Sequence, residues 1–152
     1  MSKALVIFAS KGDSSVFEPI VAGLKKEGIE HDFHICSVHR TPEELDNLLK
    51  GDYGFVISGA GLSAALPGAI AAKLAKPVIG VPVSGNYEGL DALLSIMQMP
   101  PGIPVLSVGV GKVDSVIAAA KKLQGAFSEV NIVSKGHSRA QEKADGVLRE
   151  LD

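Results

Sequence analysis

Short apolar runs recur along this chain, and each is followed by a small or polar loop and then by a segment with helical spacing. The runs fall at Ala4–Ala9, Phe55–Ile57, Val78–Val83 and Val105–Val110, with a more alternating run at His31–Ser37. Strands without polar alternation are buried on both faces, as in a parallel sheet covered by helices. The pattern therefore predicts an α/β fold, a three-layer αβα sandwich with right-handed crossovers around a parallel sheet.

The segments between these runs predict the helices. Apolar residues at helical spacing indicate helices at Val16–Leu24, Ala64–Ala75, Leu90–Met97 and Val113–Leu123. A further helix is expected to begin at Thr41, because Thr41, Pro42 and Glu44 have the residue types of an N-cap, a first-turn proline and a capping-box acid.

No long linker or low-complexity tract divides the 152 residues, so one domain is expected over 1–152, with a divergent segment from about residue 125. After Gly125 the pattern weakens. Glu129–Ser134 is compatible with a strand or a helix, and Ala140–Leu151 with a terminal helix.

Composition excludes several partners. With 15 Lys and Arg against 17 Asp and Glu and no basic cluster, nucleic acid is not an expected partner. Tyr53–Ala72 and Ala92–Gly111 are uncharged runs of 20 residues, but each contains prolines and glycines that would break a membrane helix. We therefore expect no membrane partner and interpret both runs as buried strand, turn and helix.

The cysteine content and the N-terminal sequence favour a cytoplasmic protein. Cys36 is the single cysteine and cannot form an intramolecular disulfide. The apolar opening Ala4–Ala9 is shorter than the core of a signal peptide and is not followed by a cleavage pattern.

Three loops that follow the predicted strands contain the residue types of an anion-binding site. They are Ser10–Asp13, Ser37–Pro42 and Ser58–Ser63, and each lies beside a predicted helix start, at the sheet edge where parallel α/β folds bind ligands. Arg40 offers a planar fork for phosphate oxygens. His39 is the candidate general acid and base, and Asp13 could accept hydrogen bonds from sugar hydroxyls.

Each of these residues also has a purely structural interpretation. Ser10 or Asp13 could cap the first helix, since serine and aspartate are favoured N-caps. Arg40 could pair with Glu43 or Glu44 at the surface, and His39 could be a solvated loop residue.

Other site types have weaker support. Cys36 with His39 suggests a thiol nucleophile, and these two with His31 and His34 imitate a metal cluster, but strand alternation directs neighbouring side chains to opposite faces. We expect no metal site and interpret Cys36 as a small buried side chain. Gly59-Ala60-Gly61 suggests a dinucleotide loop, but Ala64 stands at the third glycine position and no acidic residue closes the next strand.

The ordered motifs resemble the PurE proteins, which are carboxyaminoimidazole ribonucleotide mutases and aminoimidazole ribonucleotide carboxylases of purine biosynthesis. The resemblance runs from about Leu5 to Ala120. It is carried by the segments Ser37-Val38-His39-Arg40-Thr41-Pro42, Gly59-Ala60-Gly61, Leu66-Pro67-Gly68, 77–83 and, above all, Gly89-Leu90-Asp91-Ala92-Leu93-Leu94-Ser95-Ile96-Met97-Gln98-Met99-Pro100.

The resemblance implies a flavodoxin-like subunit, a homo-octamer with sites built from more than one subunit, no metal or organic cofactor, and an imidazole ribonucleotide and carbon dioxide as partners. It implies that His39 is the catalytic proton carrier. The implied substrate-binding residues are Ser10, Asp13, Ser37, Arg40, Gly59, Ala60, Gly61 and Leu66.

The chain departs from the family pattern in two loops. Ala9 and Gly12 replace a glycine and a serine of the usual opening loop, and Ala65 stands where the family commonly has a histidine. The expected function is the conversion of N5-carboxyaminoimidazole ribonucleotide to 4-carboxy-5-aminoimidazole ribonucleotide. Direct carboxylation of aminoimidazole ribonucleotide, another nucleotide carboxylation, and noncatalytic nucleotide binding remain as alternatives.

Overall fold

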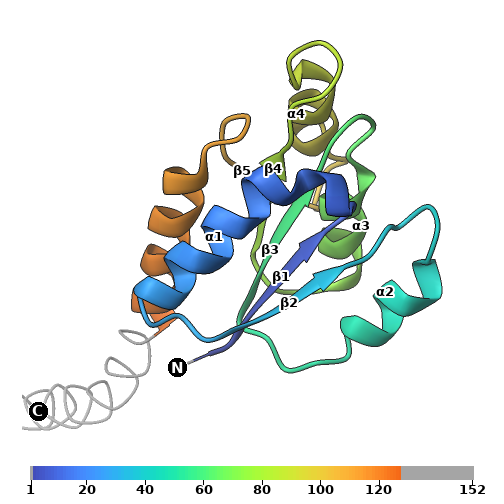
Figure 1. The fold of residues 1–152 in the computed structure, drawn as a ribbon. Coiled ribbons are helices and arrows are strands. Elements are labelled where there is room, and N and C mark those ends of the chain that lie inside the picture. The colour runs from blue at the N-terminus through green and yellow to red at the C-terminus, as the bar shows by residue number, and fades with distance from the viewer. Residues whose placement is uncertain (1, 128–152) are drawn as a thin grey trace, which may run out of the picture.

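Parallel pairing joins five strands into one sheet, in the order β2-β1-β3-β4-β5 (Figure 1). The computed structural model describes residues 2–127. The strands are β1 (Ala4–Phe8), β2 (His31–Ile35), β3 (Phe55–Ala60), β4 (Val78–Pro82) and β5 (Leu106–Ser107). The order is that of flavodoxin-like folds, with β1 between β2 and β3. The predicted α/β class is confirmed.

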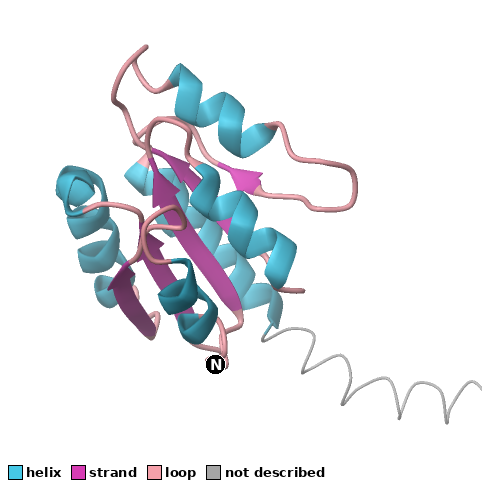
Figure 2. Ribbon diagram, turned by 90° about the vertical axis from the view of Figure 1, so that its right-hand side faces the viewer, coloured by secondary structure: helices cyan, strands magenta, loops and turns pink. Residues whose placement is uncertain are grey.

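Helices cover both faces of the sheet and complete the three predicted layers (Figures 1 and 2). They are α1 (Ser14–Lys26), α2 (Pro42–Leu48), α3 (Ala65–Lys73), α4 (Leu90–Met97) and the helix at residues 113–127, with a short 3-10 helix η1 (Lys11–Asp13) before α1. The helices predicted from apolar spacing are all present, with shifts of a few residues at their ends.

The continuous apolar run of β1 results from burial on both faces. Leu5 and Ile7 pack into a core with α2, α3 and α4, while Val6 and Phe8 pack into a second core with α1 and the helix at 113–127. All four side chains have an exposed fraction of 0%. Neither face of this central strand meets water, so the sequence shows no polar alternation there.

The last strand is much shorter than the predicted Val105–Val110. β5 contains only Leu106 and Ser107. Pro104 has no backbone N–H to donate at its start, and a turn closed by the Lys112 N–H on the carbonyl of Gly109 (3.1 Å) follows it. The strand or helix expected at Glu129–Ser134 and the helix expected at Ala140–Leu151 lie outside the described residues.

The two uncharged runs contain the expected strands, turns and helices, but the second is not buried throughout, because Leu94, Met97 and Leu106 have exposed fractions of 49%, 58% and 51%. The first contains β3 and part of α3, and the second contains most of α4 and all of β5. Within residues 2–127, no helix combines the length and the apolar character needed to cross a membrane. Cys36 is 2% exposed, which confirms the expectation that it is buried.

Candidate functional site

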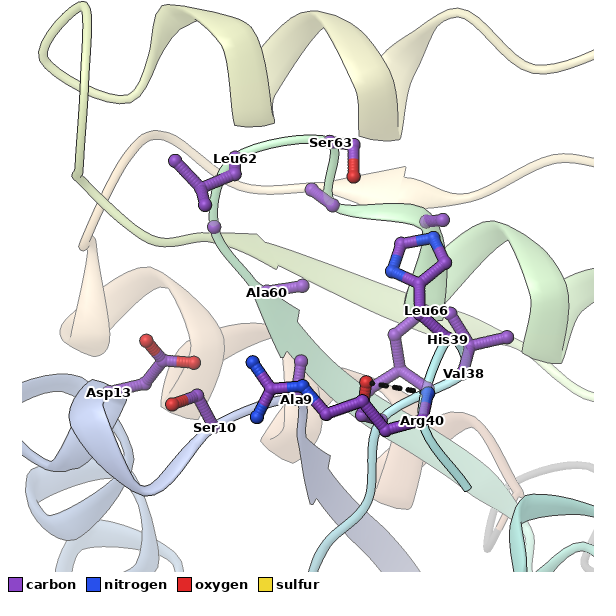
Figure 3. A pocket seen from close by; sticks show the side chains of 14 residues that line it. Ala9, Ser10, Asp13, Val38, His39, Arg40, Ala60, Leu62, Ser63 and Leu66 are labelled. Atoms are coloured by element: carbon purple, nitrogen blue, oxygen red, sulfur yellow. Dashed lines mark hydrogen bonds between the residues drawn. The ribbon is translucent and has the colours of Figure 1, made fainter. Parts of the chain in front are cut away.

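Three loops at the carboxyl edge of the sheet enclose a cavity of about 270 Å³ (Figure 3). They follow β1, β2 and β3, as the sequence predicts. The cavity is lined by Ala9, Ser10, Asp13, Ser37, Val38, His39, Arg40, Ala60, Gly61, Leu62, Ser63, Ala64, Ala65 and Leu66. Of the predicted site residues, all except Gly59 line this cavity.

Ser10 shapes the first loop through a local cap. Its hydroxyl accepts a hydrogen bond from the Gly12 N–H at 3.0 Å and so caps η1 rather than α1. A Cβ at position 12 would lie 3.3 Å from the Ser10 hydroxyl oxygen, so the glycine permits this tight turn. The capping interpretation of Ser10 is therefore correct for the turn that precedes the first long helix, and Ser10 lines the cavity as well.

Asp13 stands at the N-cap position of α1 but makes no side-chain cap hydrogen bond. Its Oδ2 atom is buried and has no hydrogen-bond partner among the described residues. Burial raises the pKa of the Asp13 carboxyl above its ordinary value, and a hydrogen bond with the Ser10 backbone partly offsets this. The carboxylate thus retains acceptor capacity on the wall of the cavity, and the structure gives it no capping role.

The second loop is folded by hydrogen bonds between Ser37 and the residues that start α2. The Ser37 carbonyl accepts from the Thr41 N–H (2.8 Å) and the Thr41 hydroxyl (3.2 Å), and the Ser37 hydroxyl accepts from the Arg40 N–H at 3.4 Å. Thr41 and Pro42 occupy the predicted N-cap and first-turn positions. The predicted capping box is wrong, because the Thr41 hydroxyl bonds to Ser37 instead of an amide of α2.

His39 and Arg40 extend into the cavity from this second loop. Figure 3 shows the Arg40 guanidinium directed toward Ser10 and Asp13, while the His39 imidazole lies on the side away from Asp13. Within residues 2–127, Arg40 forms no ion pair with Glu43 or Glu44. The surface pairing considered for Arg40 is absent there, so its cationic group is available to an anion.

The third loop has a strained backbone. Leu62 and Ala64 have φ angles of 55° and 39°, in the left-handed region that favours glycine. Leu62 is 55% exposed at the rim of the cavity. Ala65, at the position where a histidine is common in the resembling family, is the first residue of α3 and lines the cavity.

Gly59 lies inside β3 and does not line the cavity. A Cβ at this position would lie 2.0 Å from Cε1 of the Phe8 ring. The residue is therefore a glycine because the adjacent strand carries a large ring on that face. The structure gives Gly59 a packing role where a substrate contact was expected.

Several lining residues were not among the predicted ligands, namely Ala9, Val38, Leu62, Ser63, Ala64 and Ala65. Each lies within two positions of a predicted residue in the chain. Their position after a strand was the available sequence signal, because all of them except Ser63 have small or apolar side chains without polar groups.

Neither the metal site nor the thiol site finds geometric support. In the part of the chain that the structure describes, no three His, Cys, Asp or Glu residues come together to hold a metal ion. Cys36 does not line the cavity, and its Sγ lies 3.4 Å from the Thr41 hydroxyl.

Comparison with known proteins agrees with this geometry. Residues 3–144 match a family model described as AIRC, AIR carboxylase. The N5-carboxyaminoimidazole ribonucleotide mutase of Methanocaldococcus jannaschii is 42% identical over 131 residues, which cover 86% of this chain and 83% of that protein. The mutase of Pseudomonas aeruginosa is 44% identical over 119 residues, with 75% and 73% covered.

Two further similarities concern a longer protein and a solved structure. The chloroplastic phosphoribosylaminoimidazole carboxylase of Vigna aconitifolia is 35% identical over 151 residues, which cover 96% of this chain and 27% of that protein. The crystal structure of Treponema denticola PurE matches with a TM-score of 0.66 and 27% identity, covering 87% of this chain and 94% of that one. Sequence, strand order and these matches together assign the chain to the AIR carboxylase (PurE) family.

Proposed function

We propose that this protein is an N5-carboxyaminoimidazole ribonucleotide mutase of purine biosynthesis. The observation that carries the proposal is one cavity lined by an imidazole, a guanidinium, a carboxyl group and three serines. Relatives of similar length that bear the mutase name support the same activity.

The polar wall of the cavity suits a ribonucleotide. We assign the phosphate to Arg40 and Ser37, since a guanidinium binds phosphate oxygens with two parallel hydrogen bonds. Ser10 and Asp13 lie across the cavity and suit the ribose, because a carboxylate oxygen without a partner accepts hydrogen bonds from sugar hydroxyls. With the phosphate and the ribose placed in this way, the imidazole ring of the substrate faces His39 and the third loop.

The reaction moves a carboxylate from the exocyclic nitrogen of the substrate to a ring carbon. The bond between this nitrogen and the carboxyl carbon breaks and releases carbon dioxide, while protonated His39 gives its proton to the nitrogen. The ring carbon then attacks carbon dioxide, and neutral His39 removes the proton of that carbon as aromaticity returns. Each turnover restores His39 to its initial state, and no step requires a metal or an organic cofactor.

The remaining lining residues suit the retention of carbon dioxide. Val38, Leu62 and Leu66 place apolar side chains around the cavity, beside Ala60, Ala64 and Ala65. A small apolar enclosure limits the escape of the gas and the entry of water between the two steps.

We further propose that the protein works in the cytoplasm as a homo-octamer, as the family resemblance implies. Three apolar side chains support an assembly, because Leu90, Leu94 and Met97 lie on one side of α4 with exposed fractions of 54%, 49% and 58%. Apolar residues in such a stripe are suited to contact another subunit.

A second candidate function is the direct carboxylation of aminoimidazole ribonucleotide. The similarity to a plant protein named phosphoribosylaminoimidazole carboxylase favours it. The same residues would then bind the nucleotide, and carbon dioxide would enter from solution. A mutase uses the carbamate without added bicarbonate, whereas a carboxylase requires bicarbonate and is indifferent to the carbamate.

The test is the formation of 4-carboxy-5-aminoimidazole ribonucleotide from each substrate by the wild type and by His39→Asn. We expect wild-type turnover of the carbamate and loss of most of that turnover in the variant. His34→Asn is the matched control, because His34 lies in β2 and does not line the cavity. A His39→Asn protein with the wild-type rate would refute the role of His39, and binding without turnover of either substrate would refute the enzymatic function.

A further inference from the structure

The strained third loop is held from outside the cavity. Leu62 and Ala64 both line the cavity and both have positive φ angles, 55° and 39°. A residue with a side chain pays for such a conformation, which persists only where surrounding contacts fix it. The contacts of this loop therefore show what keeps the cavity in its present shape.

Two hydrogen bonds fix the loop. The Ala64 N–H donates to the Gly61 carbonyl at 3.0 Å, within the loop itself. The Ser95 hydroxyl donates to the Ser63 carbonyl and ties the loop to α4. Ala92 and Ile96, the neighbours of Ser95 in α4, have exposed fractions of 0%, so the donor stands on a helix anchored in the core.

The bonded carbonyl belongs to the peptide that joins Ser63 and Ala64. A turn of this peptide plane by about half a revolution would bring the φ of Ala64 to a negative value and relieve the strain. The same turn would break the bond to Ser95 and the bond from the Ala64 N–H to the Gly61 carbonyl, and it would direct the carbonyl oxygen away from α4. In Figure 3, α4 crosses above the loop and the cavity lies below it, so the oxygen would then face the cavity.

An inward carbonyl would oppose binding of an anion. Its partial negative charge would face the part of the cavity that the proposed function gives to the carboxylated imidazole ring of the substrate, and would repel the carboxylate. The peptide turn would also move Ser63, whose hydroxyl in Figure 3 points from the loop away from α4. The outside hydrogen bond from Ser95, together with the internal bond from the Ala64 N–H to the Gly61 carbonyl, therefore keeps the cavity unobstructed.

We propose that Ser95 is a positioning residue of this site. Its hydroxyl holds the Ser63–Ala64 peptide in the strained orientation that leaves the cavity free for an anionic ligand. Ser95 does not line the cavity, so it acts through the loop and not on the substrate. The kinetic test uses the carbamate substrate and therefore rests on the proposed mutase function. The argument from the loop geometry does not depend on that function.

The kinetic test compares Ser95→Ala, Ser95→Thr and Ser107→Ala in the mutase assay. Loss of one hydrogen bond in Ser95→Ala should raise KM for the carbamate roughly fivefold, with a smaller change in kcat. Ser95→Thr keeps a hydroxyl and should restore most of the affinity. Ser107→Ala is the control, because the Ser107 hydroxyl donates to the neighbouring Val108 carbonyl at 3.1 Å and Ser107 does not line the cavity.

A second comparison separates loop positioning from general stability. Glycine adopts positive φ without strain, so Ala64→Gly should make the Ser95 hydroxyl less important. We expect Ser95→Ala to raise KM less than about twofold when Ala64→Gly is also present. If Ser95→Ala lowers Tm but leaves KM unchanged in both backgrounds, the hydroxyl has only a structural role and the proposal is wrong.

A crystal structure of Ser95→Ala tests the geometry without reference to activity. The expected result is a turned Ser63–Ala64 peptide with its carbonyl toward the cavity. If the wild type converts neither substrate, the proposed function fails, and this structure still decides the role of Ser95. An unchanged peptide orientation in Ser95→Ala would overturn the proposal.

Discussion

The Arg40 N–H donates to the Ser37 hydroxyl at 3.4 Å, so the two residues assigned to the phosphate are joined to each other before any ligand binds. The bond spans the loop between β2 and α2, and the Thr41 hydroxyl closes that loop on the Ser37 carbonyl. The loop is thereby preorganised, and less conformational freedom is lost when a phosphate arrives.

Arg40→Ala should mainly weaken substrate binding. A charge-assisted hydrogen bond contributes about 1.5–3 kcal/mol, which corresponds to a rise in KM of roughly 10- to 150-fold. Arg40→Lys keeps the charge but not the planar fork, so its KM should lie between those of wild type and Arg40→Ala. Steady-state kinetics with the carbamate measures both, and a fall in kcat alone would contradict the phosphate assignment.

Asp13→Asn should separate binding from stability. The raised pKa of Asp13 means that the folded protein favours the protonated carboxyl, so ionisation costs stability as pH rises from the unfolded-state pKa to the folded-state pKa. Above that window, at neutral pH, Asp13→Asn should be at least as stable as wild type, yet bind the nucleotide more weakly. Near pH 3 the stability advantage should vanish.

Urea unfolding at several pH values and ligand titration at neutral pH measure the two effects. An unfolded or strongly destabilised Asp13→Asn protein would show that the carboxylate stabilises the start of α1. The absence of a side-chain cap bond at Asp13 argues against that result.

Gly59→Ala and Gly61→Ala form a matched pair. The new methyl group at position 59 would meet the Phe8 ring at 2.0 Å, so Gly59→Ala should lower the free energy of unfolding by about 1–3 kcal/mol. At position 61 the nearest atom, the Val83 carbonyl oxygen, lies at 3.4 Å, so Gly61→Ala should fold normally. Because Gly61 lines the cavity, its extra methyl group should change KM.

Thermal unfolding and kinetics on both proteins check this contrast. If Gly59→Ala keeps its stability and loses substrate affinity, Gly59 belongs to the binding site after all. A Gly61→Ala protein with unchanged KM would mean that the substrate does not approach that wall.

The sheet and the order of its elements along the chain were predictable because β1, β3 and β4 are buried throughout and their sequences are therefore almost entirely apolar. Val6 and Ile7 face opposite cores, so both must be apolar, and the sequence displays this directly. The end of β5 was not predictable in the same way. Apolar side chains continue to Val110, but the chain turns at Gly109 through backbone hydrogen bonds. The hydrophobicity of the side chains does not predict such a turn.

The polar part of the site was also predictable, whereas its shape was not. Ser37, His39 and Arg40 are recognisable because their chemistry and their place after a strand coincide. The strained backbone at Ala64 could not be read from an alanine, which usually avoids positive φ. Ser95 was missed as a site residue because its contact with Ser63 joins segments 32 positions apart in the chain.

The arrangement of all the lining residues at one edge of the sheet has an evolutionary consequence. The strands contribute only Ala60 to the cavity, whereas Ala64 and Leu66 belong to one core and line the cavity as well. Mutations can therefore accumulate at lining positions outside the cores, such as Ser10, Asp13 and Arg40, and alter ligand chemistry while the protein still folds. Substitution at another such position, Ala65 at the start of α3, can likewise change the chemistry of the cavity without rebuilding the domain.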